Sequence, residues 1–175
     1  MLVRTRRKTD RVANGSSFAI VASRYNSRYV EGMLSAARTE LKRAGAKRIQ
    51  IIRVPGAFEI PIAAARLARL RCFTPEYSSS PPTLDAIICL GVVLRGETVH
   101  ADLITEAVTW ALMELQLRYE LPVIHEVLLL ETEDQARARC LGKTHNRGAE
   151  AAQTALSMAT LMRSLDEERT RADAL

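Results

Sequence analysis

Apolar residues in this chain form short runs of strand length that alternate with longer stretches of helical spacing. The runs that predict buried strands are FAIVAS at 18–23, IQIIRV at 49–54, DAIICL at 85–90 and VIHEVLLL at 123–130. The stretches that predict helices lie at 28–44, at 58–70, from about 101 through Leu115, at 133–140 and from about Asn146 to Leu165. Gly45 gives the first helix a stop, and Pro61 fits only the first turn of the second.

This order of elements predicts the fold. Strands that alternate with helices at this spacing indicate parallel βαβ units, each with a right-handed crossover, and helices on both faces of the sheet. We therefore expect a three-layer α/β/α sandwich around a four-stranded parallel sheet, similar to flavodoxin-like folds. In such sheets ligands bind beyond the carboxyl ends of the strands, so the functional residues are expected there.

The chain length predicts a single domain. With 175 residues and 47% apolar content, the chain can bury one substantial core. We expect this domain to span 17–165, between a basic N-terminal tail at 1–16 and a C-terminal tail at 166–175. The Ser- and Pro-rich segment 71–84 predicts a surface loop.

Composition favours a cytoplasmic protein without membrane contact. No apolar stretch is long enough to cross a bilayer, and the N-terminus lacks the apolar segment of a secretory signal. Cys72, Cys89 and Cys140 are an odd number of cysteines without paired spacing. They are typical of thiols in a reducing cytosol rather than of a disulfide framework or a zinc site.

The net charge of +5 is concentrated at the N-terminus. Residues 1–16 carry five basic side chains against one aspartate, a net +4, so the remaining chain is close to neutral. A basic tail can contact phosphate, but a short solvated tail is the commoner explanation. The rest of the sequence has no basic stripe interleaved with aromatics, so nucleic acid is not an expected partner.

Unusual polar and aromatic residues stand at or near the carboxyl end of every predicted strand. The segments are SRYN at 23–26, VPGAFE at 54–59, GVVLRGETVH at 91–100 and the pair His125 and Glu126 within the fourth strand. A strand normally passes into a helix through a few small polar residues. This gathering of aromatic, carboxylate and imidazole groups therefore favours a binding or catalytic site.

Each of these features also has a structural explanation. Tyr25 can pack on a helix or stack on a planar heterocycle. Glu59, one turn into a predicted helix, can complement the helix dipole or accept hydrogen bonds from substrate hydroxyls. His100 begins a helix, where free backbone N–H groups hold anions and an imidazole can transfer protons. Arg139 is either a solvated helix residue or a phosphate ligand.

Several kinds of chemistry lack their motifs in this sequence. GxxxxGK[ST] and GxGxxG are absent, which argues against nucleotide hydrolysis and dinucleotide binding. There is also no nucleophile elbow, HExxH motif or cluster of metal ligands. The remaining chemistry is acid–base catalysis beside a bound anion.

Taken together, these segments resemble one family. RYN, VPGAFEIP, DAIICLGVVLRGETVHADLI, QARAR and NRGAEAAQTALSMATLM occur in the order and spacing of lumazine synthases, over about residues 17–165. The resemblance implies the penultimate step of riboflavin biosynthesis. In that step 5-amino-6-(D-ribitylamino)uracil condenses with 3,4-dihydroxy-2-butanone 4-phosphate, phosphate and water leave, and neither a metal nor an organic cofactor is implied.

The resemblance also implies roles for individual residues. His100 matches the catalytic base. Glu97 and Thr98 match the turn that holds the substrate phosphate, and Arg139 matches the arginine that binds it. The residues matched to the ribitylaminouracil pocket are Tyr25, Asn26, Ala57, Phe58, Glu59, Val92, Val93, Leu94 and His125.

Assembly is likewise implied by the resemblance. Family members form homopentamers with active sites between subunits, some pentamers build sixty-subunit cages, and riboflavin synthase is a candidate partner. Arg139 and His100 would come from one chain. Tyr25 and Glu59 would come from its neighbour. His145 stands where cage formers commonly carry Gly, so if that position needs φ > 0 the His is strained and a free pentamer is favoured.

The chain departs from the family pattern at three positions. His125 and Glu126 replace a usual Phe-Gly, and Ala101 replaces a usual bulky aromatic. Three classes of function therefore stay open. They are the synthase, a flavin- or lumazine-binding homologue without catalysis, and a nucleic-acid-binding module supported only by the basic tail.

Overall fold

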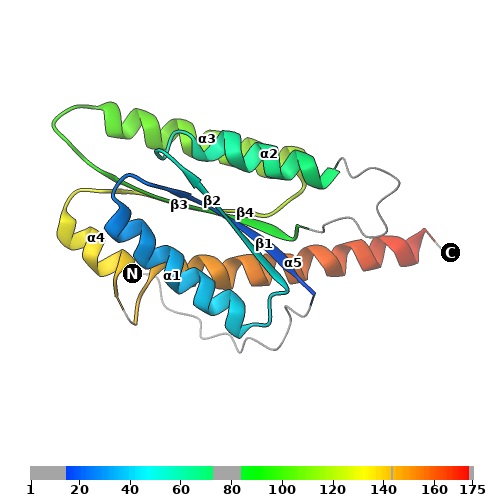
Figure 1. Ribbon diagram of the computed structural model, residues 1–175. Helices are drawn as coiled ribbons and strands as arrows, with labels where there is room; N and C mark the ends of the chain where they lie inside the picture. The colour runs from blue at the N-terminus through cyan, green and yellow to red at the C-terminus, as the bar shows by residue number, and fades with distance from the viewer. Residues whose placement is uncertain (1–14, 73–83, 143, 174–175) are drawn as a thin grey trace.

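Strands and helices alternate along the chain, as the apolar pattern predicts. The computed structural model describes residues 15–72, 84–142 and 144–173 (Figure 1). Its strands are β1 (Ser17–Ser23), β2 (Arg48–Val54), β3 (Ala86–Leu94) and β4 (Val123–Leu130). Its helices are α1 (Ser27–Arg43), α2 (Ile60–Cys72), α3 (His100–Tyr119), α4 (Glu133–Cys140) and α5 (Arg147–Ala172).

Within the described residues, the strands form one parallel sheet in the order β2-β1-β3-β4. β1 is a central strand, so Ile20 pairs with Ile51 of β2 on one side and with Ile88 of β3 on the other. Helices α2 and α3 cover one face of the sheet, and α1, α4 and α5 cover the other (Figure 1). The predicted three-layer sandwich is confirmed.

The two central strands bury side chains on both faces. Ile20 and Ile88 enter the apolar layer under α1 and α5, while Val21 and Ile87 enter the layer under α2 and α3. All four are fully buried, and each such side chain stabilises the fold by about 1.5–3 kcal/mol. Burial on both faces explains why these strands are continuous apolar runs rather than alternating ones.

Helices α1 and α5 approach each other through small residues. Ala151 and Ala155 of α5 are fully buried, and a Cβ atom on Gly148 would lie 2.0 Å from the backbone oxygen of Met33 in α1. Backbones come this close only where no side chain intervenes. Gly148 therefore permits the packing of the N-terminal turn of α5 against α1.

Several predicted boundaries need correction. Helix α5 continues to Ala172, past Leu165, where the apolar pattern predicts its end. β3 continues past residue 90 to Leu94, and α2 runs to Cys72, into the segment predicted as a surface loop. Residues 1–14 and 73–83, which make up most of the predicted tail and loop, lie outside the described residues.

Two further observations bear on the compositional predictions. Cys89 and Cys140 are buried free thiols. Across the part of the chain that the structure covers, no helix combines the length and apolar character that a membrane span needs.

Candidate functional site

The loops after β1, β2 and β3 meet at the carboxyl edge of the sheet, because these three strands are neighbours. Together with the start of α3 they form a cavity of about 560 Å³. The residues that line it are Tyr25, Asn26, Gly56, Ala57, Phe58, Glu59, Val92, Val93, Leu94, His100, Leu103 and Ile104. The predicted site residues of the first two loops, the end of β3 and His100 are thus brought together in one chain.

The loop between β1 and α1 is fixed by hydrogen bonds to its neighbours in the sheet. The backbone N–H groups of Arg24 and Tyr25 donate to the carbonyl of Pro55 at 3.1 and 3.2 Å. Asn26 adopts the left-handed conformation with φ of 53°, and its Nδ2 donates to the Val92 carbonyl at 2.9 Å. An asparagine tolerates this conformation better than most residues, so it both turns the chain into α1 and ties the loop to β3.

Because Gly56 has no side chain, the Tyr25 ring and the Glu59 carboxylate can both lie close to its backbone. Its N–H donates to Oε2 of Glu59 at 2.8 Å. A Cβ atom at this position would lie 2.9 Å from that oxygen and 3.1 Å from the Tyr25 ring. Glu59 stands just before α2 rather than one turn into it, which corrects the predicted position. Its carboxylate lines the cavity and keeps lone pairs for further donors.

The cavity has apolar walls and two exposed aromatic rings. Ala57 and Val92 are buried beneath it, while the side chains of Tyr25 and Phe58 are 72% and 61% exposed. Aromatic rings this exposed are costly to leave in water and well suited to stack on a planar heterocycle. The arrangement can therefore hold a flat ring between aromatic and aliphatic surfaces.

The start of α3 brings a titratable group and unused backbone donors to the same cavity. His100 is the first residue of α3 and lines the cavity. Val99 caps the helix without a side-chain hydrogen bond, so the first N–H groups of α3 lack the side-chain acceptor that such helices usually have. Helix starts of this kind attract anions. Glu97 and Thr98 are exposed on the preceding turn and are not among the residues that line the cavity.

His125 does not line this cavity. It lies on β4 facing α3, with Nε2 2.9 Å from Oγ1 of Thr109. The Thr109 hydroxyl also lies 2.7 Å from the Thr105 carbonyl, to which it can donate its proton. Burial lowers the pKa of His125 below its ordinary value.

Glu126, the next residue of β4, points to the opposite face of the sheet. Its side chain forms a two-pronged ion pair with Arg147 at the start of α5, with distances of 3.0 Å to Nε and 2.9 Å to Nη2. Arg147 also contacts Glu150 at 2.7 Å. Burial raises the pKa of Glu126 to about 7, and the charge of Arg147 counteracts part of that effect.

Arg139 lies on α4, away from the cavity. It is exposed and is not one of the lining residues. Its charge lowers the pKa of Glu126 and of Cys140, which places it near the Glu126–Arg147 pair. A single chain therefore supplies the cavity and the arginine at separate places.

Comparison with known proteins identifies the family. The family model for 6,7-dimethyl-8-ribityllumazine synthase matches residues 15–163. The chain belongs to this family. A synthase of that name from Salinibacter ruber is 41% identical over 90% of this chain and 95% of its own length, and one from Clostridium kluyveri is 39% identical over 88% and 94%.

One expectation drawn from this lumazine synthase resemblance is wrong. His100 was expected to share a chain with Arg139, opposite Tyr25 and Glu59 of a neighbour. In the structure His100, Tyr25 and Glu59 line one cavity of one chain. The reason is the strand order, because β3 lies beside β1 whereas β4, which leads to Arg139, is an edge strand.

Three residues that line the cavity are not among the predicted site residues. Leu103 and Ile104 follow His100 by three and four positions, so the helical repeat places them on the same side of α3. That spacing was a usable signal. Gly56 was visible in the VPGAFE segment, but only coordinates reveal how closely Tyr25 and Glu59 approach it.

Proposed function

We propose that this chain is the transferase that forms 6,7-dimethyl-8-ribityllumazine in riboflavin biosynthesis. It condenses 5-amino-6-(D-ribitylamino)uracil with 3,4-dihydroxy-2-butanone 4-phosphate and releases phosphate and water. The observation that carries this proposal is the shared cavity of His100, Tyr25, Phe58 and Glu59 in a chain that belongs to the synthase family.

The cavity walls suit the ribitylaminouracil. Tyr25 and Phe58 offer exposed rings for the flat pyrimidine, and Val93 and Leu94 offer an aliphatic wall. Glu59, held by the Gly56 N–H, accepts hydrogen bonds from ribityl hydroxyls. These contacts place the ribityl group of the substrate near the loop after β2 and its pyrimidine ring between the loops after β1 and β3.

The turn before α3 suits the phosphate of the second substrate. The backbone N–H groups of Gly96, Glu97 and Thr98 and the positive end of the α3 dipole provide donors for a dianion. A Cβ atom added to Gly96 would meet nothing within 4 Å, so the turn has open space beside it. Arg139 binds the same phosphate from an adjacent subunit.

His100 then transfers protons between the two substrates. Imine formation, phosphate loss and ring closure each move a proton beside a leaving dianion, and imidazole is the side chain that exchanges protons near neutral pH. Because both substrates are reactive, much of the acceleration comes from holding them in register. His100 provides the proton chemistry, and the cavity provides the alignment.

An assembly of several chains follows from the position of Arg139. Since Arg139 does not line the cavity of its own chain, a complete site needs a second copy, and we infer a homopentamer as in the family resemblance. Exposed apolar residues support an interface on α3. Leu103, Trp110 and Leu117 recur every seven residues on one side of that helix, and Met113 lies between the last two.

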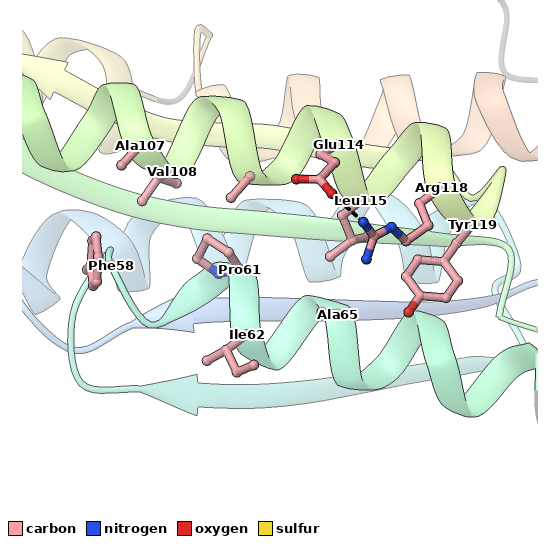
Figure 2. Close-up of a pocket in the computed structure, with 11 residues that line it drawn as sticks. Phe58, Pro61, Ile62, Ala65, Ala107, Val108, Glu114, Leu115, Arg118 and Tyr119 are labelled. Carbon is pink, nitrogen blue, oxygen red and sulfur yellow. Dashed lines mark hydrogen bonds and ion pairs between the residues drawn. The ribbon is translucent and has the colours of Figure 1, made fainter.

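A second apolar surface adjoins these exposed residues of α3. A groove of about 490 Å³ runs between α2 and α3, where Pro61, Ile62 and Phe58 face Val108 and Leu115 (Figure 2). Figure 2 also shows the ion pair of Glu114 and Arg118 at one side of the groove. An apolar surface of this kind, beside an exposed apolar helix, favours burial against another copy of the chain.

The choice between a free pentamer and a cage is not decided by His145. The described residues with positive φ are Gly15, Asn26, Gly45 and Glu120, so His145 is not in the strained conformation considered above. Particle mass in solution distinguishes the assemblies. A free pentamer has five times the chain mass of 19.4 kDa, and a cage has sixty times that mass.

The direct test of the function is product formation. Purified protein incubated with both substrates should develop the fluorescence of the lumazine product and release phosphate in equal amount. The alternative of a binding protein without catalysis would bind the product but not form it. We place the enzyme in the cytoplasm, where riboflavin synthase would consume the product.

A further inference from the structure

Arg95, the first residue after β3, joins three parts of the chain around the turn that leads into α3. Its backbone N–H donates to the Leu130 carbonyl at 2.9 Å, which extends the pairing of β3 with β4. Its Nη1 lies 2.6 Å from Oδ2 of Asp102 in the first turn of α3. Its Nε lies 2.8 Å from Oε1 of Glu131, directly after β4. One guanidinium thus ties both the start of α3 and the end of β4 to the turn.

Folding stability does not account for this arrangement. The side chains of Arg95, Asp102 and Glu131 are 36%, 40% and 56% exposed. Ion pairs this exposed add little to the free energy of unfolding, because water screens them and both partners lose side-chain freedom. The network is therefore better explained by what it does to the turn than by stabilisation of the fold.

The charges around the turn point to that role. Glu97 lies on the turn, Asp102 lies in the first turn of α3, and Glu131 is bonded to Arg95. Each carboxylate has the same sign as a phosphate, so an unpaired carboxylate here would repel a phosphate bound at the turn. Arg95 offsets the charge of Asp102 and Glu131 and holds their oxygens.

We propose that Arg95 is a positioning residue for the phosphate of the four-carbon substrate. It acts through Asp102 and Glu131, which it neutralises and holds, and through the turn at 96–99, whose start it fixes. It does not itself bond to the substrate. This inference rests on the proposed function, because the phosphate-binding role of the turn comes from there.

Substitution of Arg95 should affect the two substrates unequally. Arg95→Met leaves two carboxylates unpaired beside the phosphate, so KM for 3,4-dihydroxy-2-butanone 4-phosphate should rise about tenfold. KM for ribitylaminouracil should stay near its wild-type value, because the side-chain partners of Arg95 are Asp102 and Glu131, which have no role in binding its ring or hydroxyls. Arg95→Lys keeps the positive charge but lacks the planar guanidinium that bonds to both carboxylates at once. Its KM for the phosphate substrate should therefore lie between the values of wild type and Arg95→Met.

A second substitution separates charge compensation from simple structural damage. Adding Asp102→Asn to Arg95→Met removes one unpaired carboxylate, so KM for the phosphate substrate should fall back several-fold. If Arg95 had only a structural role, the second change would add to the damage. Arg163→Met is the matched control, because Arg163 pairs with Asp85 before β3, at the opposite edge of the sheet, with similar exposure.

Binding of inorganic phosphate, measured by titration calorimetry, keeps this test independent of turnover. Wild-type protein should bind phosphate, and Arg95→Met with unchanged circular dichroism and particle mass should bind it about tenfold more weakly. If wild type binds phosphate but forms no lumazine, the proposed function fails while the weaker binding of Arg95→Met still supports the inference. Undetectable binding by wild type, equal binding by the folded variant, or a further loss on adding Asp102→Asn contradicts it.

Discussion

In the proposed mechanism, His100 acts on both substrates. It lines the cavity with the aromatic residues Tyr25 and Phe58, and it begins the helix whose first N–H groups attract an anion. We propose that His100 takes a proton from the ribitylaminouracil and delivers it beside the departing phosphate. This position also limits its share of catalysis, because alignment of two reactive substrates continues without it.

We predict that His100→Ala lowers kcat about a hundredfold and leaves both KM values nearly unchanged. The residual rate should stay above the rate without enzyme, because the cavity still aligns the substrates. His145→Ala is the control, since His145 is exposed and does not line the cavity. Steady-state kinetics that show unchanged kcat with a raised KM would remove His100 from the proton-transfer role.

Arg139→Ala should have the opposite kinetic pattern. We predict a rise of about tenfold or more in KM for the phosphate substrate, because a guanidinium binds phosphate through two parallel hydrogen bonds. KM for ribitylaminouracil should change little. Kinetics with each substrate varied in turn measure both values, and a loss confined to kcat contradicts the binding role.

Glu126 gives stability a pH dependence of defined sign. Its pKa is raised from an ordinary value of 4.5 to about 7, chiefly because burial leaves the residue only 6% exposed. Between these pH values the folded protein holds a proton that the unfolded chain has lost, so stability is greatest below about 4.5 and falls as pH rises through 7. The full effect is about 3 kcal/mol.

Glu126→Gln removes this dependence, so the two proteins should diverge with pH. From about pH 5, near the lower end of the titration range, to about pH 8, above its upper end, Tm of the wild type should fall relative to Tm of the variant. Scanning calorimetry at a fixed protein concentration measures the difference. A constant difference, or one of opposite sign, shows that Arg147 keeps Glu126 charged throughout.

Sequence patterns identified most of the residues that line the cavity, but not the contacts of every predicted site residue. The motif segments predicted Tyr25, Phe58, Glu59 and His100, and the structure brings them together. His125 was assigned to the same pocket, yet its contact is with Thr109. The period of two in β4 indicates that His125 and Glu126 face opposite sides, but it does not reveal which element covers each side.

At the scale of elements, periodicity predicted the strands and helices, whereas the sheet order had to come from the coordinates. The order β2-β1-β3-β4 decides that three loops share one cavity and that β4 stands apart. α5 extends to Ala172 because Glu, Arg and Ala favour helix even without an apolar face. A prediction based on burial alone therefore ends this helix too early.

Gly148 offers a test of how α1 and α5 pack. Gly148→Ala places a Cβ atom against the backbone of Met33, so the helices must separate, at a cost of about 2 kcal/mol. Tm should fall by several degrees. Gly96→Ala is the matched control, because a Cβ atom there meets nothing within 4 Å. Equal Tm values for the two variants contradict the proposed packing role.

At the scale of the whole molecule, the proposed reaction depends on a site shared between chains. The cavity with His100 belongs to one chain, and Arg139 lies outside it, near the Glu126–Arg147 pair. Exposed apolar residues on α3, including Trp110 and Leu117, provide a surface that another copy can cover. No pattern in a single sequence reveals such a division, because it depends on which faces meet in the assembly.

The most direct measurement is therefore the activity of mixed assemblies. His100→Ala and Arg139→Ala chains are each expected to be poorly active when the phosphate substrate is held below its wild-type KM. The two are co-expressed with different tags, purified through both and assayed under that condition. If sites are shared, some cavities pair an intact His100 with an intact Arg139 from the neighbour, and lumazine formation rises well above that of either variant. Mixed assemblies of confirmed composition that are no more active than the separate variants would contradict the account.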